Sequence, residues 1–108
     1  MSTQPQLDQI HHVAIPVSDI AASVAWYREQ FHCDVAYQDA TWALLKFANI
    51  SLALVTSSQH PPHIALVHQD AAQFGPLTTH RDATRSIYIP DPDGNQVEVM
   101  DAASVRRY

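Results

Sequence analysis

Three side chains of this 108-residue chain have the types and the spacing that could hold a metal ion. His12 and His63 each open a stretch of alternating apolar residues, and Glu98 lies inside the last such stretch. In each stretch the large aliphatic residues alternate with the position of the polar one, so all three polar side chains project from the opposite face of their predicted strands. A carboxylate in such a position is costly unless it is exposed, paired or bound to a metal.

Two imidazoles and one carboxylate on a common face form a 2-His-1-carboxylate set. Such a set suits Fe(II) and leaves coordination positions for a substrate and O₂. Mn, Zn, Co and Ni stay open as alternatives, because affinity alone does not select the metal. A competing interpretation is a binding protein in which the three residues hold no metal. We therefore expect a divalent metal ion as cofactor, with Fe(II) favoured.

The elements that must position these residues follow from the pattern of apolar residues. His12 lies in a predicted strand at 10–17, IHHVAIPV. Ser18 or Asp19 caps a helix that runs to about Phe31, with one apolar stripe to cover a sheet. Three further strands are expected at about 33–38, 41–47 and 50–56.

The pattern then restarts after a linker at 57–62, which its two prolines stiffen. HIAL at 63–66 repeats HVAI at 12–15, which indicates an internal repeat. The second helix is expected to be one turn, because Gly75 and Pro76 stop it. Short strands near 77–80, 84–90 and 95–100 complete the copy, and a type I turn at Asp91-Pro92-Asp93-Gly94 joins the last two.

The fold class is therefore α+β, with two βαβββ modules that form a half-barrel around a cleft. Module one spans 10–56 and module two spans 63–101, so residues 10–101 form a single domain. Residues 1–9 are expected to be a flexible arm, and residues 102–108 a tail.

Composition excludes several classes of partner. A net charge of −5 with only six Lys and Arg argues against nucleic acid and against an anionic membrane surface. No run approaches the roughly 20 apolar residues of a membrane span, and the N-terminal residues do not have the pattern of a signal peptide. The single Cys33 excludes an internal disulfide and fits a reducing cytoplasm. A small-molecule substrate is the expected partner.

Three segments together resemble a known family: HHVAIPVSD at 11–19, HIALVHQD at 63–70 and YIPDPDGNQVEVM at 88–100. They are similar to the vicinal oxygen chelate superfamily, which contains glyoxalase I, extradiol dioxygenases, fosfomycin-resistance transferases and bleomycin-resistance proteins. The resemblance covers about residues 10–101. It implies metal ligands on the first and last strand of each module, and the matching positions are His12, Ala53, His63 and Glu98.

Ala53 is the informative position. Glyoxalase I and methylmalonyl-CoA epimerase have a glutamate there, whereas alanine cannot bind a metal, so a proton cannot move between two metal-bound carboxylates. The resemblance thus disfavours both activities. A His-His-Glu set is similar to that of extradiol dioxygenases and fosfomycin-resistance transferases. The latter need a cationic phosphonate pocket, for which this chain offers only Lys46, Arg81 and Arg85.

The resemblance to extradiol dioxygenases also implies two catalytic candidates. Tyr88 would donate a hydrogen bond to a developing oxyanion, and His80 would act as an acid or base. The alternatives are plain cleft lining for Tyr88 and an exposed loop position for His80. His11 and His68 are expected on the helix-facing side of their strands, away from the site.

The expected function is a small dioxygenase-like metalloenzyme, acting on a catechol-like diol or an enediolate that chelates the metal through adjacent oxygens. The alternatives are another metal-dependent lyase or thiol transferase, or a binding protein of the resistance type.

A homodimer is expected, because the short second helix leaves an apolar row uncovered. The site could close within one chain, or two chains could exchange modules. The row consists of Ile64, Leu66, Ile87, Ile89, Val97 and Val99.

Overall fold

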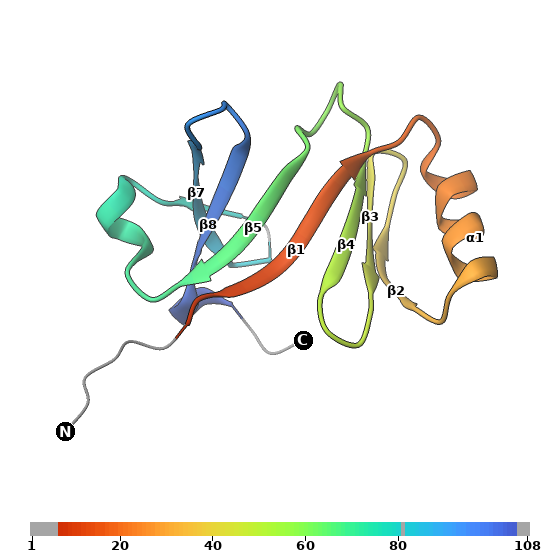
Figure 1. Cartoon of the computed structure of the whole chain (residues 1–108), viewed down its shortest axis with the longest axis horizontal. Coiled ribbons are helices and arrows are strands. Elements are labelled where there is room, and N and C mark those ends of the chain that lie inside the picture. Colours follow the sequence, from red (N-terminus) through yellow and green to blue (C-terminus); the bar gives the residue numbers. More distant parts are fainter. Residues whose placement is uncertain (1–6, 81, 106–108) are drawn as a thin grey trace.

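The computed structural model describes residues 7–80 and 82–105 as one mixed eight-stranded sheet with a single α-helix (Figure 1). The strand order is β2-β3-β4-β1-β5-β8-β7-β6. The elements are β1 (Gln9–Pro16), α1 (Ile20–Gln30), β2 (Asp34–Gln38), β3 (Trp42–Lys46), β4 (Ser51–Val55), β5 (His63–His68), the 3₁₀ turn η1 (Ala71–Phe74), β6 (Thr78–Thr79), β7 (Arg85–Pro90), β8 (Gln96–Asp101) and the 3₁₀ turn η2 (Ala102–Ser104).

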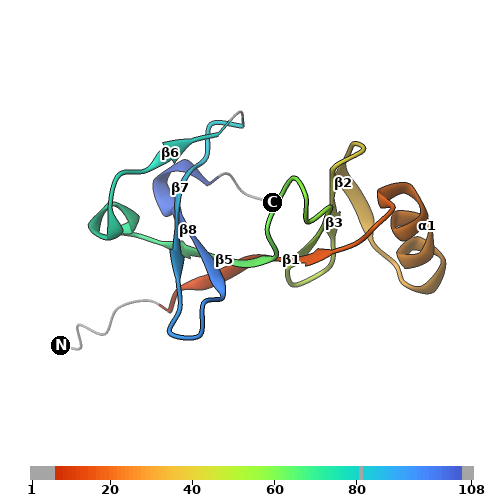
Figure 2. The ribbon, with the colours of Figure 1, turned by 90° about the horizontal axis from the view of Figure 1, so that it is seen from above.

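The two modules join through their first strands. β1 pairs antiparallel with β5, and each also pairs in parallel with the last strand of its own module, β4 or β8. Seen from above, the outer strands β2 and β6 both lie to one side of the central pair, so the sheet curves into a half-barrel (Figure 2). This confirms the predicted α+β fold of two βαβββ modules.

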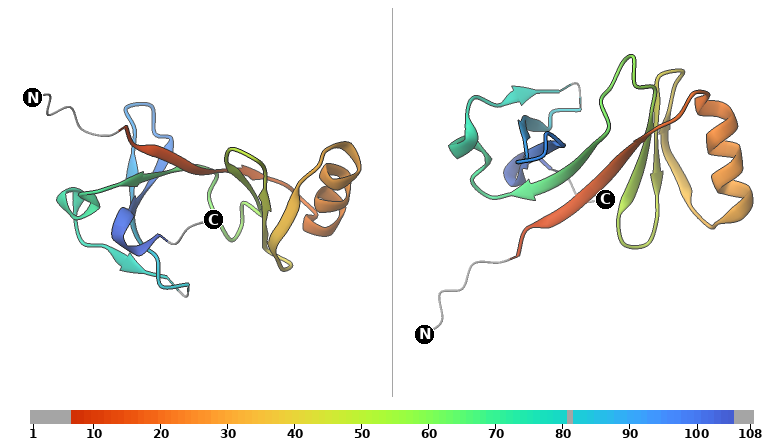
Figure 3. Two further views of the ribbon diagram at one scale, coloured as in Figure 1. Left: turned by 90° about the horizontal axis from the view of Figure 1, so that it is seen from below. Right: turned by 45° about the horizontal axis from the view of Figure 1, so that its top comes forward.

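The helix α1 begins directly after Asp19, one of its two predicted caps, and covers module one. The Asp19 carboxylate accepts a hydrogen bond from the Ala22 amide at 3.0 Å, and the helix ends at Phe31. Ile20 and Val24 are buried in a core that includes Ala43, Leu45 and Leu54. Figure 3 shows α1 and the turn η1 at opposite ends of the molecule, so each covers its own module. Within the described ranges, no helix has the length and apolar character that crossing a membrane requires.

The strand register makes the two modules equivalent position by position. In module one Ala53 lies opposite Ala14 of β1, and in module two Glu98 lies opposite Ala65 of β5. Ala53 therefore occupies the place that Glu98 has in the second copy. Its surroundings are apolar, because Ala14, Ala53 and Val55 pack with Trp42 and Leu44 on the face opposite α1.

The second helix is reduced to the single turn η1, as the sequence predicts. Gly75 ends it with φ +139°, and a Cβ there would lie 2.8 Å from Ile87 Cδ1, so the chain needs glycine at this close approach. η1 packs against β7 and β8. Val99 is buried, contrary to the expected uncovered row, whereas Ile64, Leu66, Ile87, Ile89 and Val97 are half-buried.

Regular structure extends slightly beyond both limits of the expected domain at 10–101. Gln9, which was expected in the arm, begins β1, and 102–104, which were expected in the tail, form η2. The Asp101 carboxylate accepts hydrogen bonds from the Arg85 guanidinium and the Ala103 amide, and so fixes η2 beside β7. The rest of the predicted arm, 1–6, and of the tail, 106–108, lies outside the described residues.

The homodimer stays a prediction, now based on the five half-buried side chains. We expect a dimer by sedimentation velocity at micromolar concentration, because burying each such side chain stabilises the assembly by up to about 1.5–3 kcal/mol. Ile89→Lys should shift the protein towards monomer. Trp26→Lys places the same charge on an exposed residue of α1 and should leave the dimer intact. A monomeric wild-type protein would contradict the expectation.

Candidate metal centre

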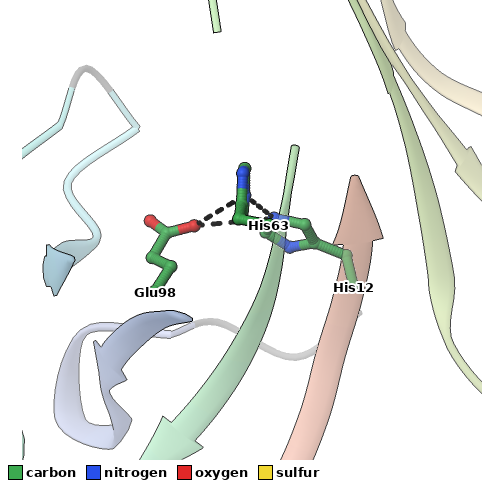
Figure 4. Close-up of side chains that lie close together, drawn as sticks. All are labelled: His12, His63 and Glu98. Atoms are coloured by element: carbon green, nitrogen blue, oxygen red, sulfur yellow. Dashed lines mark hydrogen bonds and ion pairs between the residues drawn. The ribbon is translucent and has the colours of Figure 1, made fainter. Parts of the chain in front are cut away.

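The three predicted ligands meet where the two modules join. His12 comes from β1, His63 begins β5, and Glu98 lies in the middle of β8. The two Nε2 atoms are 3.0 Å apart, and Glu98 Oε1 lies 3.2 Å from His63 Nε2 and 3.5 Å from His12 Nε2 (Figure 4). The structure thus brings the set together within one chain, and no exchange of modules between chains is needed to assemble it.

These distances fit a metal ion. Ligand bonds of about 2.0–2.2 Å that meet near right angles place donor atoms about 3 Å apart. All three donor atoms lie within 4.8 Å of one another. Nitrogen and carboxylate donors in this combination suit Fe(II) and its divalent neighbours.

Hydrogen bonds on the outer nitrogens orient both imidazoles. His63 Nδ1 lies 2.8 Å from the Pro61 carbonyl oxygen, which can only accept, so this nitrogen carries hydrogen. His12 Nδ1 lies 2.7 Å from His11 Nδ1, and one of the two donates to the other. A hydrogen on Nδ1 leaves the Nε2 lone pair of the same ring free to bind a metal.

His11 is not where the alternation of the strand predicts. The pairing of β1 with β5 shifts register between Ile10 and His12, so His11 is the extra residue of a β-bulge. Its ring lies 5.0 Å from that of His12, centre to centre, instead of on the opposite face. No feature of the sequence marks the bulge. His68 lies apart from the triad, hydrogen-bonded to Asp8 and Gln73.

Glu98 is buried, and its two oxygens have different partners. Oε1 faces the two histidines, whereas Oε2 accepts a hydrogen bond from Ser86 Oγ at 2.8 Å. Ser86 Oγ also lies 2.6 Å from His80 Nε2, which brings His80 within 3.7 Å of Oε2. The sequence gives Ser86 the same strand face as Tyr88, but a serine alone does not indicate a site.

The environment sets the charges of the three ligands. Burial would raise the pKa of Glu98, but hydrogen bonds from His63 and Ser86 and the nearby imidazoles lower it to about 2, so the group is a carboxylate. Burial lowers the pKa of His12 to about 4, so this imidazole is neutral near pH 7. Burial would also lower the pKa of His63. Hydrogen bonds to Glu98 and to the Pro61 carbonyl outweigh that effect, so the pKa of His63 is raised.

Tyr88 lies beside the triad. It pairs directly with Glu98 across β7 and β8, and its ring is 5.2 Å from that of His63, edge to face. Burial, followed by the charge of Glu98, raises the pKa of its phenol. Tyr88 therefore keeps its proton and can donate a hydrogen bond, while 41% of the residue remains exposed.

The candidate cations for a phosphonate pocket are not gathered at the triad. Arg85 is held by Asp101, and Lys46 lines a hollow of about 520 Å³ together with Phe31, Phe47 and other residues, none of them from the triad. Arg81 lies outside the described residues. Among the residues that the structure describes, no Lys or Arg forms an ion pair or hydrogen bond with His12, His63 or Glu98.

Comparison with known proteins identifies relatives. The sequence profile of the Glyoxalase/Bleomycin resistance protein/Dioxygenase superfamily matches residues 9–75. No curated protein sequence matches the chain.

Several solved structures are similar. One is a Streptomyces coelicolor methylmalonyl-CoA epimerase (S115T) in complex with 2-nitronate-propionyl-CoA, with 19% identity, a TM-score of 0.68, and coverage of 95% of this chain and 100% of that one. A superfamily member from Vibrio splendidus 12B01 has 9% identity, a TM-score of 0.63, and coverage of 88% and 99%. At these identities the likeness shows the fold alone.

We expect the purified protein to bind about one divalent ion per chain after reconstitution with Fe(II), Mn, Co, Ni or Zn, because the three donors converge on one point. His63→Ala should abolish binding, as elemental analysis of the desalted protein would show. His68→Ala removes a histidine from the same strand but outside the triad and should bind normally. Wild-type protein that takes up none of these ions would contradict a metal centre.

The affinity should also depend on pH in one direction. His63 has a raised pKa, whereas that of His12 is lowered, so His63 is the imidazole ligand whose proton competes most with the metal for Nε2. Affinity should therefore fall by about tenfold per pH unit below the pKa of His63 and level off above it. Isothermal titration in buffers of different ionisation enthalpy should show about one proton released per ion near pH 6. Affinity that is unchanged between about pH 6 and about pH 8 would contradict this assignment.

Proposed function

The chain belongs to the glyoxalase/bleomycin resistance protein/dioxygenase superfamily, and on that premise we propose a small metal-dependent enzyme of the dioxygenase-like type. His12, His63 and Glu98 would hold one divalent ion, with Fe(II) favoured over Mn, Zn, Co and Ni. The observation that carries the proposal is the convergence of two imidazole Nε2 atoms and one buried carboxylate oxygen, which lie 3.0–3.5 Å from one another.

The proposed substrate is a small molecule with two adjacent oxygens, such as a catechol-like diol or an enediolate. A bound divalent ion would supply Lewis acidity and a template for such a pair of oxygens. Among the described residues the set has three donors, and Ala53 occupies the place of Glu98 in module one, where a fourth donor would otherwise stand. This leaves more of the coordination sphere for the substrate.

Two further residues have proposed roles. Tyr88 keeps its phenol proton and stands beside His63, so it can donate a hydrogen bond to charge that develops on a substrate oxygen. His80 is the proposed acid or base, because its ring is partly exposed and lies within 3.7 Å of Glu98.

Ala53 is the main argument against a glyoxalase or an epimerase. Both of those reactions would use a carboxylate on each side of the metal, and here the register gives module one a methyl group instead. A different metal-dependent lyase or a thiol transferase is the alternative within the same superfamily, and a binding protein of the resistance type is the alternative outside catalysis. Fold alone does not choose among them.

We propose that this enzyme is a homodimer and that it works in a reducing cytoplasm. The half-buried apolar side chains of module two support the dimer. The single cysteine, Cys33, supports the compartment.

A panel of catechols and related diols tests the chemistry. Anaerobic Fe(II)-loaded protein should develop a chelate absorption with a substrate, and admission of air should consume O₂ and give a ring-opened product. Tyr88→Phe should keep its iron while turnover falls by about 10²–10³, since one oxyanion donor is lost. Trp26→Phe, on the outer surface of α1, is the matched aromatic control and should keep full turnover. Absence of O₂ uptake across the panel, with iron loaded, would count against the dioxygenase-like reaction.

A further inference from the structure

The carboxylate of Glu98 is held from two sides by different groups. Oε1 lies 3.2 Å and 3.5 Å from the two histidines of the triad. Oε2 points away from them and accepts a hydrogen bond from Ser86 at 2.8 Å. The residue is only 6% exposed, and among the described residues every buried side-chain oxygen and nitrogen has a partner.

The direction of each hydrogen bond follows from the chemistry of the groups. The hydrogen bond between Ser86 and Glu98 runs from the hydroxyl to the carboxylate oxygen, so the single hydroxyl hydrogen of Ser86 points to Oε2. The oxygen of Ser86 is then free to accept a hydrogen bond, and the donor is His80 Nε2 at 2.6 Å. His80 therefore fixes the rotation of the hydroxyl, and Ser86 fixes the carboxylate.

The position of Ser86 follows from the strand register. Ser86 lies opposite Met100 in module two, and the equivalent pair in module one is Trp42 opposite Val55. Module one thus has a tryptophan in place of the serine, just as it has Ala53 in place of Glu98. The hydroxyl and the carboxylate occur together in one module and are absent together from the other.

We propose that Ser86, oriented by His80, is a positioning residue that makes Glu98 a one-oxygen metal ligand. It occupies Oε2, so that only Oε1 can reach an ion between the two histidines. The inference rests on the proposed metal site. It goes beyond that site by assigning the number of oxygens that Glu98 contributes and the residues that determine this number.

A purely structural role for Ser86 makes a different prediction. If the hydroxyl served only to satisfy a buried carboxylate, its removal would lower the stability of the metal-free protein and leave the coordination of a bound ion unchanged. If it positions Glu98, removal frees Oε2, and the carboxylate can turn so that both oxygens face the ion. Co(II) separates these cases, because its visible absorption depends on the number and geometry of its ligands.

The experiment is a titration of metal-free wild-type and variant proteins with Co(II), followed by visible absorption and by isothermal titration. Ser86→Ala should lose about 10–100-fold in Co(II) affinity, the usual effect of removing a hydrogen-bond partner of a ligand, and its Co(II) spectrum should change. Ser86→Thr keeps the hydroxyl and should restore both. His80→Phe keeps the serine but not its orienting donor, and should show a smaller loss in the same direction.

Ser104→Ala is the matched control. Its hydroxyl accepts from the Arg85 amide and donates to the Asp101 carbonyl in the same module, without reaching the triad, so this variant should lower Tm but not Co(II) affinity. If Ser86→Ala binds Co(II) with wild-type affinity and spectrum, the inference about Ser86 is overturned while the proposed metal site stands. If Ser86→Ala does not fold, an unchanged affinity in His80→Phe would overturn it. A wild-type protein that binds no Co(II) would instead overturn the proposed function and the inference with it.

Discussion

The antiparallel pairing of β1 with β5 is the contact on which the rest of the structure depends. It joins the first strands of the two modules into one sheet. His12 and His63 therefore lie on neighbouring strands, at the junction between the modules. Each of these strands also pairs in parallel with the last strand of its own module, so Glu98 is one strand away from His63. Because neighbouring strands lie about 4.8 Å apart, the register places these three side chains at diagonal positions on one face, close enough to meet.

Burial of Glu98 imposes the second constraint. A carboxylate that is 6% exposed needs polar partners, and here two imidazoles face Oε1 while one hydroxyl donates to Oε2. The same contacts that keep it ionised also orient it. The interior of module two is therefore built around a paired polar cluster, whereas that of module one is built around the packing of α1 on Leu45 and Leu54.

The alternation of apolar residues was sufficient to predict the strands, the capped helix at Asp19 and the common face of the triad, because these follow from local periodicity and chain symmetry. The bulge at His11 was not predictable, since it depends on how β1 slides against β5. The burial of Val99 was not predicted, because a helix of one turn was expected to leave that face uncovered, whereas η1 packs against both β7 and β8. The bridge through Ser86 needed the register of β7 with β8 in addition to the face on which it lies.

The unequal character of the two modules has a consequence for selectivity. A fully repeated pair of modules would have an approximate two-fold axis through the seam, and a small ligand there could lie either way round with equal energy. Here one flank presents Trp42, Leu44 and Ala53, and the other presents Ser86, Tyr88 and Glu98. The two orientations of an asymmetric ligand, such as the proposed diol, would therefore differ in energy, so the unequal modules would favour one orientation over the other.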